Sequence, residues 1–328
     1  MEITKQNILE NAKDFFLPQL KPNDLIAIEL DNCSSVNILF EREDVEKIEQ
    51  LMIKKGNCST NEAVDKIVDG TAYSSHALPF YLYNFSALKM IENMFKSNSN
   101  MTMVELGANN GLVSRLLGRN GFKFQKYFGI DFDFSFIIDG LWQFNEADNQ
   151  FPKYFMQGDF NKPLIFKDGS VDFVYFQEAF DHCRDKYFYS ERLLSEINRI
   201  LKPDGLLYIT LVFEHEYRDL YHWDHNYIWS KDEFESVVSD YFDIVKFNSL
   251  LTFEHVLYEQ ALRLTGIQKV INNWPIKLAK QMCASFVPER DAAVGAYLLR
   301  KKFKKLSQSV IERYGTKNFK NGDAKCSN

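Results

Sequence analysis

The sequence predicts an α/β fold, with a parallel sheet and helices on both of its faces. Between residues 101 and 213, short apolar runs typical of strands alternate with amphipathic runs typical of helices, and such alternation builds parallel sheets. A glycine-containing loop, residues 107–111, joins the first of these strands to the first helix. The 328 residues are 45% hydrophobic, which is enough for one large domain or two ordinary ones and excludes a disordered chain.

Residues 1–80 are expected to form a small α+β cap in front of the main domain. Apolar residues there recur at helical spacing or alternate over short runs, and Pro18 ends the first helix. The expected elements are a helix over 7–17, strands over 25–30 and 36–40, and helices over 43–54 and 61–68. No residue pattern in this segment indicates chemistry.

The main domain is expected to span residues 81–300. Its first helix carries apolar residues on one side and ends in the polar linker 97–100. The elements expected after the linker are strands over 101–106, 126–130, 171–176 and 206–213, and helices over 112–117 and 187–201. The sequence contains no internal repeat.

Charge is distributed unevenly along the chain. The formal charge is −6, but residues 300–328 carry nine basic and two acidic residues, while residues 1–299 carry 30 basic and 43 acidic ones. Binding of nucleic acid through its phosphates needs a surplus of lysine and arginine, so the acidic body argues against that partner. The basic tail, 301–328, is of a kind that more often keeps a protein soluble than docks a partner.

Cysteine content and hydropathy indicate a cytoplasmic protein without a membrane span. The five cysteines are an odd number and form no C-x-x-C pair, which favours free thiols. The N-terminus has an acid at position 2 and lacks the apolar segment of a signal peptide. The longest apolar stretch, residues 206–213, is less than half of a membrane span.

The loop Gly107-Ala108-Asn109-Asn110-Gly111 is the most informative segment. Its small residues, between an apolar strand and an amphipathic helix, let a ligand approach backbone amides at a helix N-terminus. Any tight strand-to-helix turn also favours glycine, so the loop alone leaves ligand binding and a purely structural turn open. The spacing differs from G-x-G-x-x-G, which argues against a dinucleotide oxidoreductase.

Three further motifs follow this loop. Asp131 ends the next strand, twenty residues after Gly111, where an acid would hold a ribose diol; an ordinary loop aspartate is the alternative. The motif Gly158-Asp159-Phe160 offers a carboxylate to an adenine amino group and a ring to cover the base. The sequence Lys202-Pro203-Asp204-Gly205 predicts a type I turn that reverses a helix into a strand.

In this order and spacing, the four motifs resemble those of class I S-adenosylmethionine-dependent methyltransferases. The similarity covers residues 85–248. In Glu105-x-Gly107-x-Asn109-x-Gly111, Asn109 stands in place of the family's middle glycine, and asparagine tolerates positive φ. The usual Pro-Gly-Gly turn is Pro203-Asp204-Gly205 here. The resemblance implies a Rossmann-like, mostly parallel sheet of seven strands, the last two at 243–247 and 292–299.

The resemblance also implies the cofactor S-adenosyl-L-methionine. The loop 107–111 would line the methionine moiety of the cofactor, and Glu105 would order this loop and contact the amino end. Asp131 would hold the ribose. Asp159 and Phe160 would hold the adenine. The full set of residues expected to bind the cofactor is Glu105, Gly107, Ala108, Asn109, Gly111, Asp131, Phe132, Gly158, Asp159, Phe160 and Gln177.

Histidines cluster where the acceptor would bind. Four of the six lie between residues 182 and 225, on segments expected at the carboxyl ends of strands, where open α/β sheets bind ligands. Methyl transfer is an in-line displacement that needs alignment, and a base when a hydroxyl must lose its proton. We expect His182, and after it His225, to act as that base. The alternative is that each only caps a helix or binds backbone.

Two other segments bear on the site. Residues 214–225 hold histidines and carboxylates at short spacing, which can ligate a metal, but no H-E-x-x-H or facial-triad register is present and we expect no metal. Residues 250–290 show helical apolar periodicity and are expected to form a lid with the N-terminal cap. A lid of that size favours a small molecule as acceptor.

These observations predict a methyltransferase that acts on an oxygen or nitrogen of a small metabolite, such as a sugar or a natural-product intermediate. The alternative is a regulatory or interaction protein that binds S-adenosylmethionine without transfer and docks a partner through its basic tail. Methylation of tRNA or rRNA fits poorly with the acidic body. The sequence carries no signal for an oligomeric state.

Overall fold

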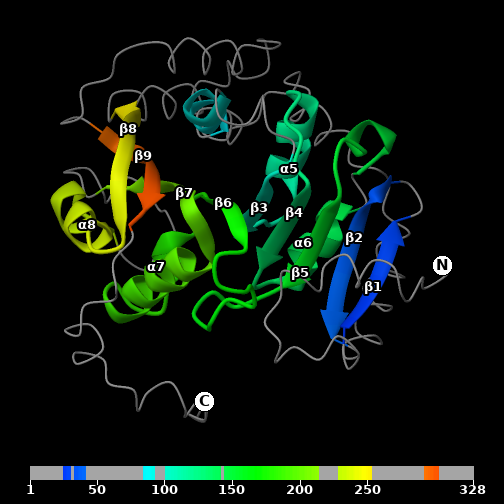
Figure 1. Cartoon of the computed structure of the whole chain (residues 1–328), viewed down its shortest axis with the longest axis horizontal. Coiled ribbons are helices and arrows are strands. Elements are labelled where there is room, and N and C mark those ends of the chain that lie inside the picture. Colours follow the sequence, from blue (N-terminus) through cyan, green and yellow to red (C-terminus); the bar gives the residue numbers. More distant parts are fainter. Residues whose placement is uncertain are drawn as a thin grey trace, which may run out of the picture.

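A nine-stranded sheet organises the part of the chain that the structure, a computed structural model, describes: residues 25–30, 33–41, 84–92, 100–141, 144–213, 228–252 and 292–302. The strands are β1 (Leu25–Leu30), β2 (Cys33–Glu41), β3 (Thr102–Leu106), β4 (Lys126–Asp131), β5 (Lys153–Gln157), β6 (Val171–Phe176), β7 (Leu201–Val212), β8 (Phe242–Thr252) and β9 (Ala292–Lys301). Their order is β1-β2-β5-β4-β3-β6-β7-β9-β8, with the hairpin β1–β2 at one edge and β8 at the other (Figure 1).

The seven strands from β3 to β9 confirm the mostly parallel sheet predicted from the sequence. β5, β4, β3, β6 and β7 run parallel, and β9 lies antiparallel between β7 and β8. The hairpin β1–β2 makes the sheet longer than predicted. It joins the sheet because β2 pairs in parallel with β5, from Val36↔Lys153 to Leu39↔Met156. The strands expected in the N-terminal segment are therefore confirmed, and they extend the same sheet that carries the motifs.

The predicted helices after the linker are also present. They are α5 (Leu112–Arg119) and α7 (Phe188–Ile200), and residues 84–92 are helical as well. α8 (Lys231–Val238) begins after Ser230, whose hydroxyl accepts a hydrogen bond from the Glu233 amide while the Glu233 carboxylate accepts one from the Ser230 amide. This capping box explains where the helix starts.

Three short elements were not indicated by the sequence pattern. They are α6 (Phe134–Leu141) and the 3-10 helices η3 (Glu146–Asp148) and η4 (Phe180–His182). α6 is mostly apolar, so its sequence does not separate an apolar side from a polar one. η3 and η4 have three residues each, which is too short for a helical pattern to show in the sequence.

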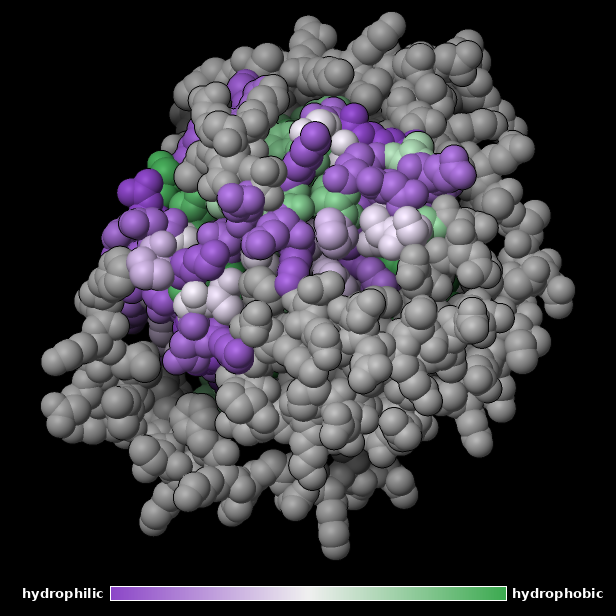
Figure 2. Space-filling view, turned by 45° about the vertical axis from the view of Figure 1, so that its right-hand side comes forward, coloured by the Kyte–Doolittle hydropathy of each residue, from purple (hydrophilic) through white to green (hydrophobic). Residues whose placement is uncertain are grey.

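Two apolar clusters cover the two faces of the sheet. Met103 and Tyr127 belong to the cluster that packs against α5, α6 and residues 84–92, while Val104 and Phe128 belong to the cluster under α7 and α8. Adjacent strand residues fall in different clusters because successive side chains point to opposite faces. Helices thus cover both faces of the sheet, as predicted. The described residues form a mostly hydrophilic surface in the view of Figure 2.

The turn between α7 and the main part of β7 differs from the prediction. A type I turn needs a negative φ at its third position, but Asp204 has φ 62°. Positive φ at that position belongs to the type II pattern, which aspartate tolerates better than most residues. A Cβ on Gly205 would lie 2.8 Å from the Lys202 carbonyl oxygen, which explains the glycine at the fourth position.

Several sequence predictions lie outside the described residues. These are the helices over 7–17, 43–54 and 61–68, nearly all of the lid insertion at 250–290, and nearly all of the basic tail at 301–328. Among the helices of the described ranges, none combines the length and the apolar character that a membrane crossing requires.

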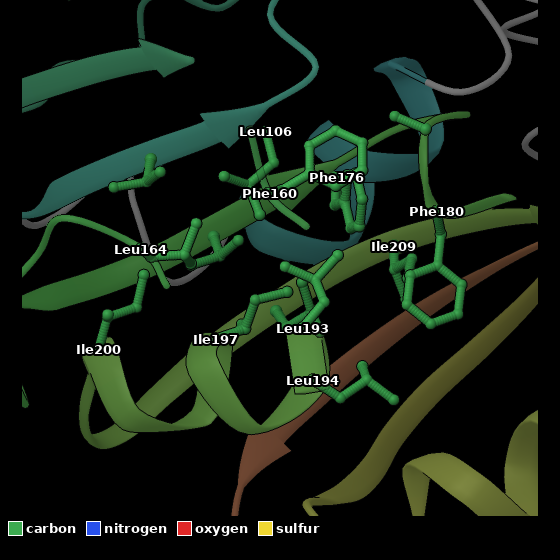
Figure 3. Packing of buried hydrophobic residues seen from close by; sticks show 14 of the residues in the cluster. Leu106, Phe160, Leu164, Phe176, Phe180, Leu193, Leu194, Ile197, Ile200 and Ile209 are labelled. Atoms are coloured by element: carbon green, nitrogen blue, oxygen red, sulfur yellow. The ribbon is translucent and has the colours of Figure 1, made fainter. Parts of the chain in front are cut away.

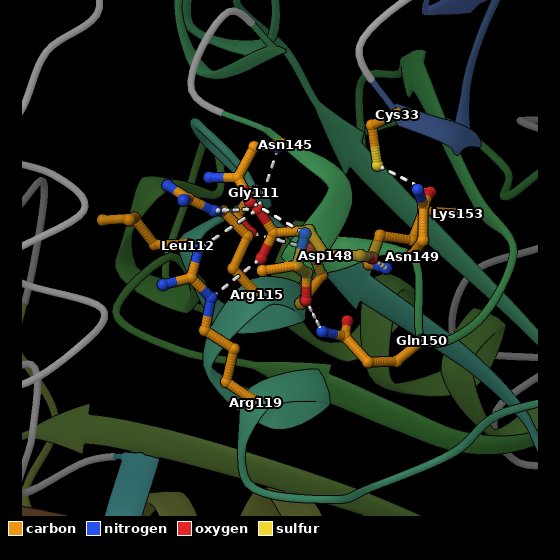
Figure 4. A network of polar contacts seen from close by, with 12 residues as sticks. Cys33, Gly111, Leu112, Arg115, Arg119, Asn145, Asp148, Asn149, Gln150 and Lys153 are labelled. Atoms are coloured by element: carbon orange, nitrogen blue, oxygen red, sulfur yellow. Dashed lines mark hydrogen bonds and ion pairs between the residues drawn. The ribbon is translucent and has the colours of Figure 1, made fainter.

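A buried ionic network joins the hairpin to α5. The Asp148 carboxylate is fully buried and lies 3.0 Å from Nε of both Arg115 and Arg119 on α5 (Figure 4). On the other side of Asp148, the ammonium of Lys153 donates to the Asp148 carbonyl at 2.5 Å, and burial lowers the pKa of Lys153 to about 8. One carboxylate therefore compensates several buried cations at this point.

Asn149 completes the link to β2. Its Oδ1 accepts hydrogen bonds from the Ser35 amide and the Cys33 thiol, both at 3.0 Å. Cys33 is buried and free, and burial raises the pKa of its thiol. The hairpin is thus held to the segment that fixes the first turns of α5.

We predict that Asp148→Asn lowers the free energy of unfolding by about 3 kcal/mol, because the loss of one partner leaves buried arginine charges without compensation. Urea denaturation measures this change. Asp168→Asn is the matched control, since Asp168 is 78% exposed in its ion pair with Arg199 and its loss should cost less than about 1 kcal/mol. Equal effects of the two variants would contradict the structural role of the buried network.

Candidate functional site

The loop after β3 adopts the conformation that its small residues allow. Gly107, Asn109 and Gly111 have φ values of 76°, 45° and 74°, in the left-handed region. A Cβ on Gly111 would lie 2.8 Å from the ring of Phe155, and one on Gly107 would lie 2.8 Å from Cβ of Ala179. Glycine is therefore required at both positions for conformation and for space, and α5 starts directly after Gly111.

The loop is bound to the end of β4. The amides of Gly107 and Ala108 both donate to the Ile130 carbonyl, at 2.8 and 2.9 Å. The Asn109 amide donates to Oδ2 of Asp131 at 2.7 Å. The structure thus brings the predicted loop and the predicted ribose acid into direct contact.

Asp131 retains capacity for a ligand. Its Oδ1 accepts from the Asp133 amide at 3.0 Å, and the Phe132 amide also binds the carboxylate. Three backbone amides thus use three of the roughly four acceptor sites of the carboxylate, which leaves one for a ligand. Burial raises the pKa of Asp131. Phe132, directly after it, is 65% exposed, so an aromatic face is available beside the carboxylate.

Glu105 lies buried within β3, one residue before the strand ends. Its carboxylate accepts a hydrogen bond from the hydroxyl of Tyr127. Burial raises the pKa of Glu105 to about 8, and the charge of Asp131 acts in the same direction. The carboxyl is therefore protonated at neutral pH in this structure. Its expected contact with the amino end of the cofactor stays a prediction.

The motif after β5 lies next to Asp131. Gly158 donates its amide hydrogen to the Asp131 carbonyl at 2.8 Å, and a Cβ on Gly158 would lie 2.5 Å from a methyl carbon of Ile130. Oδ1 of Asp159 accepts from the Asn161 amide at 2.9 Å. The glycine thus lets the predicted ribose and adenine residues approach each other.

Phe160 is placed differently from its expected role. The ring is 9% exposed and packs edge-on against Phe176, with a centroid distance of 5.5 Å. Figure 3 shows it among Leu106, Leu164 and Phe176, above the apolar side of α7. Because the ring belongs to the core, little of it is left to cover a base, whereas Phe132 is exposed.

The segment after β6 contacts the glycine loop. Leu106 pairs with Phe176, so Gln177 and the two residues after it lie beside Gly107. The Gln177 side chain is held by the Tyr175 hydroxyl, which donates to its Oε1 at 2.7 Å. Gln177 is thus next to the other predicted cofactor residues.

The two predicted bases are not both placed by the structure. His182 ends η4 and is exposed, and its amide donates to the Ala179 carbonyl at 3.2 Å. His225 and the segment 214–225 lie outside the described residues. In the ranges that the structure does describe, no group of histidine, cysteine and acidic side chains has the arrangement of a metal site.

Sequence reasoning missed two partners of these residues. Tyr127 binds Glu105, and Tyr175 lies 2.9 Å from Oδ1 of Asn84 as well as holding Gln177. Both tyrosines lie inside mostly apolar strands, and this position is the only sign in the sequence that they are buried. Such a pattern predicts a buried tyrosine but not the partner of its hydroxyl.

The residues present fit an adenosyl cofactor with a cationic sulfur. The glycines at 107 and 111 let the loop backbone lie close against Ala179 and Phe155, Asp131 keeps acceptor capacity for a diol, and Phe132 presents a ring face. The fold and this site define a class of protein: an α/β enzyme that binds a nucleoside cofactor at the carboxyl edge of its sheet.

The comparison with protein families specifies the class. Residues 104–209 match the family model described as a methyltransferase domain. This match spans the glycine loop, Asp131, Asp159 and the segment after β6. The chain therefore contains a class I S-adenosylmethionine-dependent methyltransferase domain, and it is an enzyme that uses S-adenosylmethionine. A search of curated proteins gives no match.

Solved structures with a similar fold have low sequence identity. The [4+2]-cyclase SpnF is 15% identical with a TM-score of 0.48, over 79% of this chain and 96% of that one. A methyltransferase from Methanosarcina mazei is 15% identical with a TM-score of 0.45, over 66% and 98%. A phosphoethanolamine N-methyltransferase from Haemonchus contortus, solved with S-adenosylhomocysteine, is 19% identical with a TM-score of 0.43, over 66% and 51%.

We predict that the cofactor-free protein loses stability as pH rises from about 4.5 to about 8 because of Glu105. Over this window the unfolded chain releases a proton that the native carboxyl keeps, so the free energy of unfolding falls with pH and levels off above the native pKa. Urea denaturation across this pH window measures the free energy of unfolding. It should fall by on the order of a few kcal/mol in the natural protein, and this fall should be absent in Glu105→Gln. Parallel pH profiles of the variant and the natural protein would contradict the raised pKa.

Proposed function

We propose that this methyltransferase moves a methyl group to an oxygen or nitrogen of a small metabolite, such as a sugar or a natural-product intermediate. The observation that carries the proposal is a set of exposed aromatic rings at the carboxyl edge of the sheet. Besides Phe132, which is proposed to contact the cofactor, Phe136 in the first turn of α6 is 46% exposed and Tyr187, directly before α7, is 54% exposed. Exposed rings beside a cofactor site suit a small organic ligand.

The cofactor is proposed to lie across the ends of β3 and β4. Asp131 would bind the ribose hydroxyls, Phe132 would contact the adenine, and Asp159 would accept a hydrogen bond from the adenine amino group. The loop amides around Asn109 would face the methionine moiety. When bound, S-adenosylmethionine supplies a methyl group on a positively charged sulfur.

The protein's own contribution to transfer is proposed to be alignment and removal of a proton. Alignment of two reactants in a closed site accounts for much of the rate of such a displacement. His182 and His225 are the bases that the sequence predicts, and His182 is exposed at the end of η4, six residues after β6. The lid expected at 250–290 would exclude water from the acceptor.

The proposed partner is a small acceptor and not a nucleic acid. Residues 1–299 hold 43 acidic against 30 basic residues, which disfavours phosphate binding. Cys33 and Cys183 are buried and form no disulfide, which supports a proposed cytoplasmic location. A panel of small hydroxyl and amine compounds, assayed for release of S-adenosylhomocysteine, tests the acceptor class. Turnover of RNA alone would contradict it.

We predict that Asp131→Ala weakens binding of S-adenosylhomocysteine by more than about tenfold, because a charge-assisted hydrogen bond to a ligand is worth about 1.5–3 kcal/mol. Isothermal titration calorimetry measures the dissociation constant. Asp133→Asn is the matched control, because Asp133 is exposed two residues away and should change the constant by less than about twofold. Unchanged binding by Asp131→Ala would show that the ribose site lies elsewhere.

A further inference from the structure

The segment that follows β6 contains a backbone conformation that needs an explanation. Glu178 has φ 49°, in the left-handed region that residues with a side chain seldom adopt. Its amide donates to Oγ1 of Thr210, a buried residue of β7, at 3.0 Å. Such conformations persist where the surrounding structure fixes them, and they gather at functional sites.

Glu178 stands beside the cofactor loop. Leu106 and Phe176 are paired and end the neighbouring strands β3 and β6, so the residues that follow the two strands lie side by side. Ala179 touches the loop so closely that a Cβ on Gly107 would lie 2.8 Å from its own Cβ. Glu178 is thus the first ionisable residue after β6, next to the loop that would line the methionine end of the cofactor.

The charge of Glu178 acts on the Tyr175 hydroxyl, which holds the Gln177 side chain. Burial raises the pKa of the Tyr175 hydroxyl, and the charges of Tyr208, Glu105 and Glu178 act in the same direction. The Tyr175 hydroxyl lies 2.7 Å from Oε1 of Gln177. Tyr175 belongs to the face that α5 covers, so the Glu178 carboxylate lies within electrostatic range of a hydroxyl group on that face.

His182 is less well placed for chemistry than Glu178. It lies four residues further along the chain, at the end of η4, and it is exposed, whereas Glu178 is half-buried. Between them Phe180 is fully buried in the cluster on the opposite face, stacked on Trp229 at 5.8 Å.

We propose that Glu178 is the catalytic residue that meets the nucleophilic group of the acceptor at the transferable methyl group and takes up its proton. The proposal rests on the proposed function. For a hydroxyl acceptor, the proton passes to a carboxylate oxygen of Glu178 and the acceptor oxygen bonds to the methyl carbon. The electron pair of the broken S–C bond stays on sulfur. The products are a methyl ether, neutral S-adenosylhomocysteine and a protonated Glu178, so atoms and charge balance.

Binding of sinefungin tests this placement without knowledge of the acceptor. Sinefungin carries a protonated amine where S-adenosylmethionine carries its methyl group, and S-adenosylhomocysteine has nothing there. If Glu178 faces that position, Glu178→Gln weakens sinefungin by about tenfold or more and changes S-adenosylhomocysteine by less than about twofold, both by calorimetry on the full chain. Asp181→Asn, a matched change three residues away, should leave the ratio of the two affinities unaltered.

Each other outcome overturns the proposal in a distinguishable way. An unchanged ratio in Glu178→Gln would show that the carboxylate does not face the transfer position, while the proposed function would stand. An equal loss of both ligands would show that Glu178 only shapes the loop. If the natural protein binds neither ligand, the proposed function fails and this inference fails with it.

Discussion

The site depends on one pair of hydrogen bonds, from the amides of Gly107 and Ala108 to the carbonyl of Ile130. These bonds hold the loop after β3 over the end of β4, and they require the positive φ of Gly107. Once the loop is held there, the Asn109 amide reaches the Asp131 carboxylate and α5 begins at a defined point. The contact of the loop with Asp131 and the start of the helix both follow from these two hydrogen bonds.

Two buried electrostatic arrangements support the loop from below. Asp148 compensates the arginines of α5 and joins them to the segment that holds β2. Glu105 is kept neutral near physiological pH by its burial beside Tyr127. The first arrangement fixes the helix, and the second keeps a negative charge out of the apolar face. A cation bound close to Glu105 would favour release of its proton, so cofactor binding and protonation are coupled through this residue.

Local patterns in the sequence predicted most of the sheet and the positions of the loop and the acid on which the proposed site depends. Glycine spacing and strand periodicity act over a few residues, so the sequence predicts that the β3–α5 loop and Asp131 lie at the ends of neighbouring strands, as they do in the structure. The pairing of Val36 with Lys153 is a contact between distant segments, which periodicity does not record. The positive φ of Asp204 and Glu178, and the burial of Phe160, depend on neighbours that only the folded chain brings together.

A crystal structure of the full chain with S-adenosylhomocysteine tests the central claim most directly, namely that the loop held on Ile130 forms the cofactor site. The ribose hydroxyls should bind the Asp131 carboxylate, the adenine should lie against Phe132, and the sulfur should stand beside the segment 177–179. A ligand bound away from Asp131, or a loop that has left the Ile130 carbonyl to admit it, would contradict this account.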